Sequence, residues 1–166
     1  MSLLKPDFIF NRAADISVDF LMSRGVHGII LDLDGTVCPT RGVQADEACE
    51  EWLHTLTNYG IKIYLLSNNR HIERVRAFCE SYGIELYSNR AAKPFRRGFL
   101  KAAAELAVPY KNIAVIGDQI YTDVLGGNRL GMQTFFVFSS DYSIWYIRLR
   151  HLLELPFLRG KRQSCV

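Results

Sequence analysis

The residues best suited to chemistry in this sequence are carboxylates that directly follow apolar runs. Asp32 and Asp34 follow the run Gly28–Leu31, and Asp118 and Asp123 follow a second run. Short apolar runs of this kind are typical of strands buried inside a parallel sheet. Since ligands bind at the carboxyl ends of such strands, we expect these carboxylates to meet at one edge of the sheet.

Clustered carboxylates repel one another and are costly to remove from water, so a cation must lie among them. Ser67 and Asn68 follow a third apolar run, and Lys93 stands in a loop before a helix. Carboxylate oxygens suit Mg²⁺, and phosphoryl transfer needs positive charge on the phosphoryl oxygens. An Asp-x-Asp pair alone is equally typical of a solvated turn. The other polar strand ends instead favour a site for Mg²⁺ and a phosphoryl group.

The segments that must position these residues alternate between strand and helix. Strands are expected at 28–31, 61–66, 85–87, 112–116 and 133–138, and helices at 17–24, 45–58, 71–82, 95–107 and 121–130. This order predicts an α/β fold with a doubly wound, mostly parallel sheet and helices on both faces. We expect one globular unit over residues 1–141, including an N-terminal extension, and a C-terminal tail over residues 142–166.

Four motifs resemble those of the haloacid dehalogenase (HAD) superfamily, in the same order. They are Asp32-Leu-Asp-Gly-Thr-Val37, Ser67, Lys93-Pro94 and Gly117-Asp118-Gln-Ile-Tyr-Thr-Asp123. The resemblance implies a Rossmann-like HAD core. It also implies Asp32 as the nucleophile that forms an aspartyl-phosphate, and Asp34 as general acid and then general base.

The resemblance further implies the ligands of the metal and of the phosphate. Asp118 would complete the Mg²⁺ site with the Asp32 carboxylate and the Asp34 main-chain carbonyl, and Asp123 would be a further ligand or a nearby supporting carboxylate. The residues expected around the phosphoryl group are Thr36, which would also orient the turn, Ser67, Asn68 and Lys93. Because haloacid dehalogenases themselves lack an acid/base at the position of Asp34, a phosphatase is implied.

The spacing of the motifs leaves no room for the cap domain that many HAD phosphatases carry. Thirty residues separate Thr36 from Ser67, and 25 separate Ser67 from Lys93. An open crevice admits a large substrate, whereas a small metabolite would need an oligomer or the loop 38–43 as a lid. Over its whole length the sequence resembles HAD subfamily IIIA, the group similar to phosphatidylglycerophosphate phosphatase. The resemblance implies this phospholipid as substrate, with a soluble sugar phosphate or nucleotide as the alternative.

The tail carries the basic excess of the sequence. Residues 1–147 hold 15 Lys and Arg against 16 Asp and Glu, whereas residues 148–166 hold 5 against 1. At 100° per residue, one face of a helix gathers Tyr142, Trp145, Tyr146, Leu149, Leu152 and Leu153. A basic amphipathic helix of this kind either lies on an anionic membrane surface or docks its apolar face on the sheet.

The remaining observations concern location and other classes of function. The amino terminus lacks a signal-peptide pattern and four scattered cysteines favour reduced thiols, so we expect a cytoplasmic protein, with peripheral contact at the membrane face. The charge balance of the sequence does not indicate a nucleic-acid-binding surface. Arg90, Arg96 and Arg97 either bind a second phosphate or cover a helix start, and Arg70, Arg74 and Arg76 are expected on an exposed helix face. A receiver-like phospho-Asp signalling domain is the non-enzymatic alternative, which Asp34 disfavours.

Overall fold

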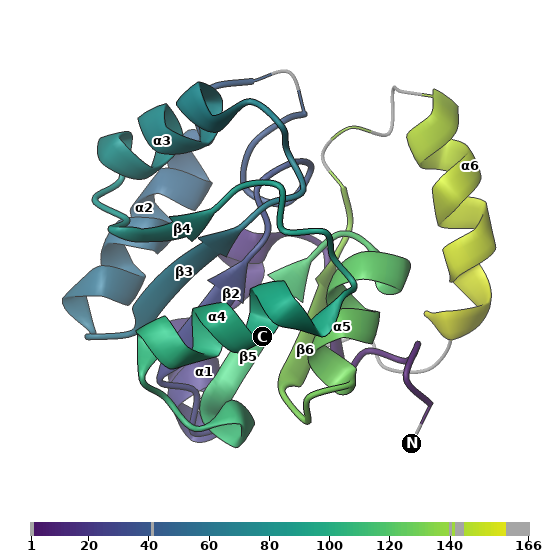
Figure 1. The fold of residues 1–166 in the computed structure, drawn as a ribbon, viewed down its shortest axis with the longest axis horizontal. Helices are drawn as coiled ribbons and strands as arrows, with labels where there is room; N and C mark the ends of the chain where they lie inside the picture. The colour runs from purple at the N-terminus through teal and green to yellow at the C-terminus, as the bar shows by residue number, and fades with distance from the viewer. Residues whose placement is uncertain (1, 41, 140, 142–144, 159–166) are drawn as a thin grey trace.

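The computed structural model describes residues 2–40, 42–139, 141 and 145–158 and forms one six-stranded parallel sheet (Figure 1). The strands are β1 (Phe8–Phe10), β2 (Gly28–Leu31), β3 (Lys62–Leu66), β4 (Leu86–Ser88), β5 (Ile113–Gly117) and β6 (Gln133–Val137). Their order is β1-β6-β5-β2-β3-β4. The predicted doubly wound α/β fold is therefore confirmed, and β2 and β5, which precede the acidic motifs, are neighbours at its centre.

Helices cover both faces of the sheet. They are α1 (Val18–Ser23), α2 (Glu47–Asn58), α3 (Ile72–Ser81), α4 (Arg96–Leu106), α5 (Leu125–Asn128) and α6 (Trp145–Glu154). Alternate residues of β2 point to opposite faces, as in any strand. Ile29 and Leu31 pack in the cluster that contains α1, α2 and α3, and Ile30 packs in the cluster that contains α4. In Figure 1, α6 stands apart at the edge of the molecule.

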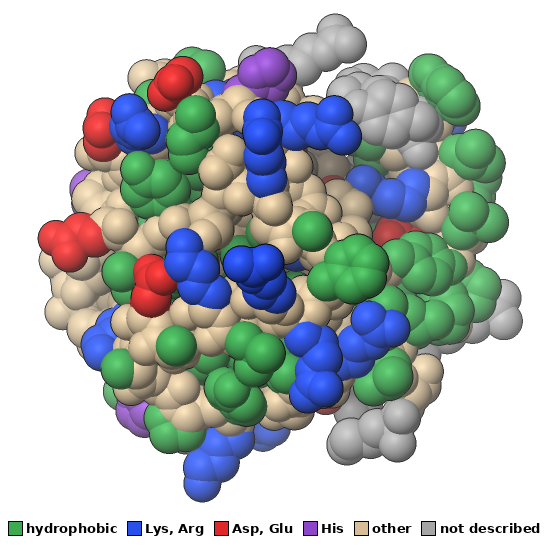
Figure 2. Space-filling view, in the orientation of Figure 1, with side chains coloured by type: hydrophobic (Ala, Val, Ile, Leu, Met, Phe, Trp, Pro, Cys, Tyr) green, Lys and Arg blue, Asp and Glu red, His purple; other side chains and the backbone are tan. Residues whose placement is uncertain are grey.

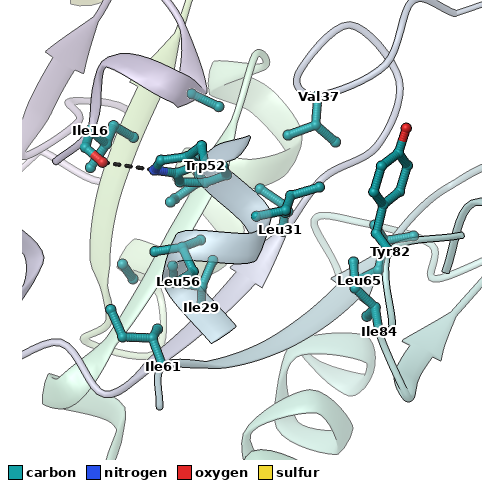
Figure 3. Close-up of a cluster of buried hydrophobic side chains, with 14 of the residues drawn as sticks. Ile16, Ile29, Leu31, Val37, Trp52, Leu56, Ile61, Leu65, Tyr82 and Ile84 are labelled. Atoms are coloured by element: carbon teal, nitrogen blue, oxygen red, sulfur yellow. Dashed lines mark hydrogen bonds between the residues drawn. The ribbon is translucent and has the colours of Figure 1, made fainter. Parts of the chain in front are cut away.

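A tryptophan joins the amino-terminal segment to the larger core cluster (Figure 3). The Trp52 side chain on α2 is 6% exposed, and its Nε1–H donates a 2.7 Å hydrogen bond to the carbonyl oxygen of Ile16. Burying an indole ring is favourable provided that its single donor finds an acceptor. This contact holds the segment before β2 against the helices that follow it.

Two elements differ from the sequence-based expectation. Residues Phe8–Phe10 form an edge strand beside β6, where we expected only an irregular extension. The single helix predicted at 121–130 is a π-helical turn at Ile120–Val124 followed by the short α5. The π turn places Asp123 at the site, and two glycines of α5, Gly126 and Gly127, pack closely on Phe99 and Val115 respectively. The other predicted helices and strands are confirmed within a few residues of their expected ends.

Candidate active site

The acidic residues meet because their strands are paired. Leu31 of β2 lies opposite Ile116 of β5, and the Asp32 amide donates a 2.9 Å hydrogen bond to the Ile116 carbonyl oxygen. One oxygen from each of the buried carboxylates Asp32, Asp118 and Asp123 lies within 4.8 Å of the others. The sheet therefore brings together three groups that are 86 and 91 positions apart, counted from Asp32.

Lys93 bridges two of these carboxylates. Its ammonium Nζ lies 2.5 Å from Asp32 Oδ1 and 2.7 Å from Asp123 Oδ1, and its side chain is 3% exposed. Burial opposes the charged ammonium, but the carboxylates of Asp123 and Asp32 outweigh that effect and raise the pKa of Lys93. Lys93 is therefore a fixed positive charge beside Asp32.

One ammonium leaves the acidic cluster short of positive charge. Burial, reinforced by repulsion from Asp32, raises the pKa of Asp118 to about 7. Burial also raises the pKa of Asp123 to about 6, although Lys93 acts in the opposite direction. Asp118 Oδ1 is buried and has no hydrogen-bond partner within the described residues. An unpartnered oxygen among three converging carboxylates suits a divalent cation, which prefers hard oxygen ligands.

The carboxylate of Asp34 lies beside this cluster rather than within it. The strand ends at Leu31, so Asp32 and Asp34 do not continue the regular alternation of β2. Arg74 Nη1 contacts Asp34 Oδ1 at 2.6 Å, and Asn69 Nδ2 donates a 3.0 Å hydrogen bond to Oδ2. Asp34 is thus separated from the grouped carboxylates and held by its own partners.

Arg74 contacts the candidate site, which the sequence-based prediction missed. We expected it on an exposed helix face, but its side chain is only 15% exposed. Besides Asp34, it donates to the carbonyl oxygens of Gly42 and Pro39. The helical spacing from His71 to Tyr82 gives no signal that would distinguish Arg74 from its neighbours, because its partners come from the distant loop after β2. Arg74 therefore ties the Asp34 carboxylate to the loop that begins at Cys38.

The expected phosphate ligands surround the cluster. Thr36 Oγ1 donates a 3.3 Å hydrogen bond to Asp32 Oδ2, and Ser67 is buried with its Oγ accepting from the Asn69 amide. Asn68 Oδ1 accepts from the Lys93 amide at 2.8 Å, while Asn68 Nδ2 donates to the Lys93 carbonyl at 3.2 Å. Asn68 thus fixes the main chain of Lys93.

Glycine is required at the turn after Asp34. Gly35 has φ +82°, and a Cβ there would lie 2.7 Å from Asp118 Oδ2 and 2.6 Å from Ser139 Oγ. A side chain would therefore both strain the backbone and push Asp118 out of place. The Asp-Gly-Thr sequence lets the loop after β2 pass directly over the carboxylate delivered by β5.

Helix α6 contacts this site through charged side chains. Arg150 Nη2 lies 2.7 Å from Asp118 Oδ2, and Glu154 Oε1 accepts a 2.9 Å hydrogen bond from the Ile120 amide. Glu154 is 1% exposed, and Ile147 on the same helix is buried as well. The side of α6 that faces the core therefore holds an arginine and a glutamate directed at the loop between Asp118 and Asp123.

The opposite side of α6 is apolar and exposed. The exposed fractions are 74% for Trp145, 53% for Leu149, 61% for Leu152 and 60% for Leu153. The expected apolar face also includes Tyr142 and Tyr146, but Tyr142 and the side chain of Tyr146 lie outside what the structure describes. Cys165 lies outside the described residues as well. The expectation that this face docks on the sheet is wrong for the four described residues. No helix in the described part of the chain is both long and apolar enough to cross a bilayer.

Known proteins resemble this chain in sequence and in fold. Residues 42–131 match the haloacid dehalogenase-like hydrolase family. The probable phosphatase YqeG of Bacillus subtilis is 37% identical over 132 residues, covering 80% of this chain and 76% of that protein.

Solved structures show the same fold at low sequence identity. The cobalt-bound deoxy-D-mannose-octulosonate 8-phosphate phosphatase YrbI of Haemophilus influenzae has a TM-score of 0.56 and 18% identity, covering 76% of this chain and 75% of that one. The 3-deoxy-D-manno-octulosonate 8-phosphate phosphatase of Yersinia pestis has a TM-score of 0.54 and 13% identity, covering 90% and 93%. With more than half of its length matched and a relative at 37% identity, the chain belongs to the haloacid dehalogenase-like hydrolases and is an enzyme of the phosphatase type.

Proposed function

We propose that the chain is a Mg²⁺-dependent phosphomonoester hydrolase acting through an aspartyl-phosphate. The ligands of the ion would be the carboxylates of Asp32, Asp118 and Asp123 together with the Asp34 main-chain carbonyl. When bound, Mg²⁺ supplies positive charge to the phosphoryl oxygens. Ser67, Asn68 and Thr36 would complete the phosphate site. The observation that supports this proposal best is the buried carboxylate group around Lys93 with its unpartnered oxygen.

The two chemical steps use Asp32 and Asp34 in turn. An oxygen of Asp32 forms a bond to phosphorus while the bond from phosphorus to the leaving oxygen breaks, and the Asp34 carboxyl gives that oxygen its proton. Water then attacks phosphorus, Asp34 accepts a proton from it, and the bond to Asp32 breaks to release phosphate. Lys93 lies where it can offset the charge of Asp32 and of the phosphoryl group in both steps.

Phosphate release from an aryl phosphate tests this proposal. We expect release by the native chain with Mg²⁺, loss of release on chelation, and no release by Asp32→Asn. Asp32→Asn keeps the size of the side chain but removes the attacking carboxylate. Undiminished release by Asp32→Asn would rule out the nucleophile assignment.

For the substrate, we propose phosphatidylglycerophosphate, the phospholipid of the subfamily that the sequence resembles. In the described chain, the segments between β2 and β3 and between β3 and β4 each contain a single helix, which leaves the crevice without a cap domain. Helix α6 contacts the site through Arg150, while its exposed apolar face points away from the site at the right edge of Figure 2. Residues 148–166 hold the basic excess. An exposed apolar face with basic residues suits an anionic lipid surface. We therefore propose that residues 142–166 form a membrane-contacting tail on the unit 1–141.

Cosedimentation with phosphatidylglycerol vesicles tests the lipid surface. We expect the full chain to sediment with these vesicles and not with phosphatidylcholine vesicles. The double variant Leu149→Ser/Leu152→Ser should lose most of this binding and keep activity on an aryl phosphate, because both side chains point away from the site. Arg129→Ala on the core is the matched charge control. Equal sedimentation of the double variant would exclude α6 as the contact.

A soluble substrate is the second candidate. Both named structural neighbours are phosphatases of an eight-carbon sugar-acid phosphate. If the chain acts on a soluble substrate, its turnover will be higher on soluble sugar phosphates than on the phospholipid in mixed micelles. The Leu149→Ser/Leu152→Ser variant will then have the same turnover as the unmodified chain on every substrate.

A further inference from the structure

A cavity of about 400 Å³ adjoins the candidate active site and has not yet been assigned a role. It is lined by Asn68, Arg70, Arg90 and Ala92. Asn68 also fixes the main chain of Lys93 through two hydrogen bonds, so the cavity and the proposed phosphate site share a wall. The cavity therefore borders the proposed phosphate site.

The cavity is positively charged. Arg70 and Arg90 are both exposed, and neither forms an ion pair with a carboxylate among the residues that the structure describes. Arg74, on the following helix, is in contrast fully engaged with Asp34 and two carbonyl groups. Figure 2 shows Lys and Arg side chains gathered on the viewed face over the loops that follow β3 and β4. Unpaired guanidinium groups beside a phosphate site favour a further anion.

The main chain holds Arg90 in place despite an unfavourable conformation. Arg90 and Ala92 have φ +49° and +52°, in the left-handed region that is unfavourable for non-glycine residues. The loop is anchored at both sides of Arg90, because the Arg90 amide donates to the Asn69 carbonyl and the Ala91 amide to the Ser67 carbonyl, each at 3.0 Å. These bonds join the loop after β4 to the loop after β3, which carries Arg70. The main chain at Arg90 is therefore fixed relative to Ser67 and Asn69.

Both arginines are close in the sequence to residues of the proposed phosphate site. Arg70 is three positions after Ser67, and Arg90 is three before Lys93. Three residues span at most about 11 Å, and the reach of an arginine side chain adds to or subtracts from that distance. Arginine also matches carboxylate and phosphate oxygens with two parallel donors.

We propose that the cavity lined by Arg70 and Arg90 binds a second anionic group of the substrate, whose phosphomonoester occupies the site at Asp32 and Lys93. This inference rests on the proposed phosphatase function and narrows its substrates to phosphomonoesters that carry a carboxylate or phosphodiester near the reacting phosphate. A phospholipid headgroup with two phosphates and an acidic sugar phosphate share this chemistry.

Steady-state kinetics with matched soluble substrates test the inference. Glycerol 3-phosphate has no second anion, glycerophosphoglycerophosphate adds a phosphodiester, and 6-phosphogluconate adds a carboxylate. For Arg70→Ala and Arg90→Ala, we expect KM for the preferred two-anion substrate to rise roughly 10- to 100-fold, the range for a lost hydrogen bond to a charged group. KM for glycerol 3-phosphate should change far less, so the ratio of the two KM values is the readout. Whichever two-anion substrate shows the larger change identifies the second anion as phosphodiester or carboxylate.

Two further measurements keep the outcomes distinct. Arg129→Ala removes an exposed charge that does not line the cavity and should leave the KM ratio unchanged. Calorimetric binding of the preferred two-anion substrate to Asp32→Asn, with and without Arg90→Ala, measures recognition without turnover. Equal KM ratios in the native chain and both arginine variants would overturn the inference. Failure of the native chain to hydrolyse any phosphomonoester, including an aryl phosphate, would instead overturn the proposed function.

Discussion

Asp34 differs from the other acidic residues in its surroundings. Asp32, Asp118 and Asp123 are buried around Lys93, whereas Asp34 is partly exposed and contacts Arg74 and Asn69. Two carboxylates that stand one residue apart in the sequence thus occupy distinct environments. This division suits a nucleophile that must not carry a proton and an acid/base that must exchange one with water.

Asp34→Asn should keep the fold and metal binding but lose most turnover. Because a positioned acid/base contributes roughly 10²- to 10⁴-fold, we expect kcat to fall within that range. The measurement is phosphate release from a substrate with a poor leaving group, since such a group depends most on proton donation. Turnover equal to that of the unmodified chain would contradict the acid/base assignment.

Arg74→Ala should reduce turnover by acting through Asp34. Loss of the guanidinium frees Asp34 and the loop at Gly42, and misplacement of a catalytic group costs up to roughly 100-fold. A double-mutant cycle separates this effect from a direct one, because Arg74→Ala should add little once Asp34 is Asn. Arg76→Ala, in an exposed pair on the same helix, is the control. Additive losses in the double variant would show that Arg74 acts independently.

At the scale of elements, the close approach of α5 to α4 positions the π turn that carries Asp123. A Cβ at Gly126 would lie 2.2 Å from a ring carbon of Phe99, a fully buried residue of α4. No rotation of a buried phenyl ring relieves a contact of this kind without moving its neighbours. The glycine therefore allows the short α5 to lie directly on α4.

Gly126→Ala should destabilise the fold by about 1–3 kcal/mol through overpacking. Urea unfolding measures the effect. Phe99→Leu removes the opposing ring, so the double variant should lose less stability than the sum of the two single variants. A purely additive double variant would rule out the clash as the cause.

Helix α6 should make stability depend on pH through Glu154. Burial raises the pKa of Glu154 from 4.5 in the unfolded chain to about 7 in the folded one, so the folded state binds more protons between these values. Stability from this group is therefore full below about pH 4.5 and falls as pH rises towards 7. Glu154→Gln keeps an acceptor for the Ile120 amide and should flatten this part of the curve, which urea unfolding at several pH values measures. An unchanged slope would show that another group titrates.

At the scale of the whole molecule, the carboxylates of Asp32, Asp118 and Asp123 repel one another at the carboxyl edge of the sheet. Three buried carboxylates face one ammonium and one guanidinium. Burial, with repulsion from Asp32 as a smaller cause, raises the pKa values of Asp118 and Asp123. An ion that binds the folded chain and not the unfolded one stabilises the fold by mass action. Metal binding should therefore be visible in global stability.

Saturating Mg²⁺ should raise the melting temperature. At 100 times the dissociation constant the gain is about 2.7 kcal/mol, or roughly 5–10 °C for a chain of this size. Asp118→Asn removes a proposed ligand and should lose most of this shift, although it also relieves repulsion and need not lower the melting temperature of the metal-free chain. An equal Mg²⁺ shift in Asp118→Asn would place the ion elsewhere.

The sequence by itself determined the sheet architecture and the convergence of the acidic motifs. Apolar runs, helical periodicity and glycines are local signals, and parallel pairing then forces the carboxyl ends of β2 and β5 together. The order of the motifs was enough to identify the family. The sheet architecture and the family can be predicted because they depend on short segments that are recognised from their own residues alone.

Only the tertiary structure decided which residues support the site from afar. Arg74 meets Asp34 across 40 positions and Arg150 meets Asp118 across 32, and no local pattern encodes such contacts. The three-residue β1 exists because β6 lies beside it, and the periodicity of α6 defined an apolar face without saying which way it turns. That direction is fixed by Glu154 and Arg150, because their polar groups find partners in the loop after β5. Periodicity is a property of one segment, whereas the orientation of a helix depends on its contacts with another segment.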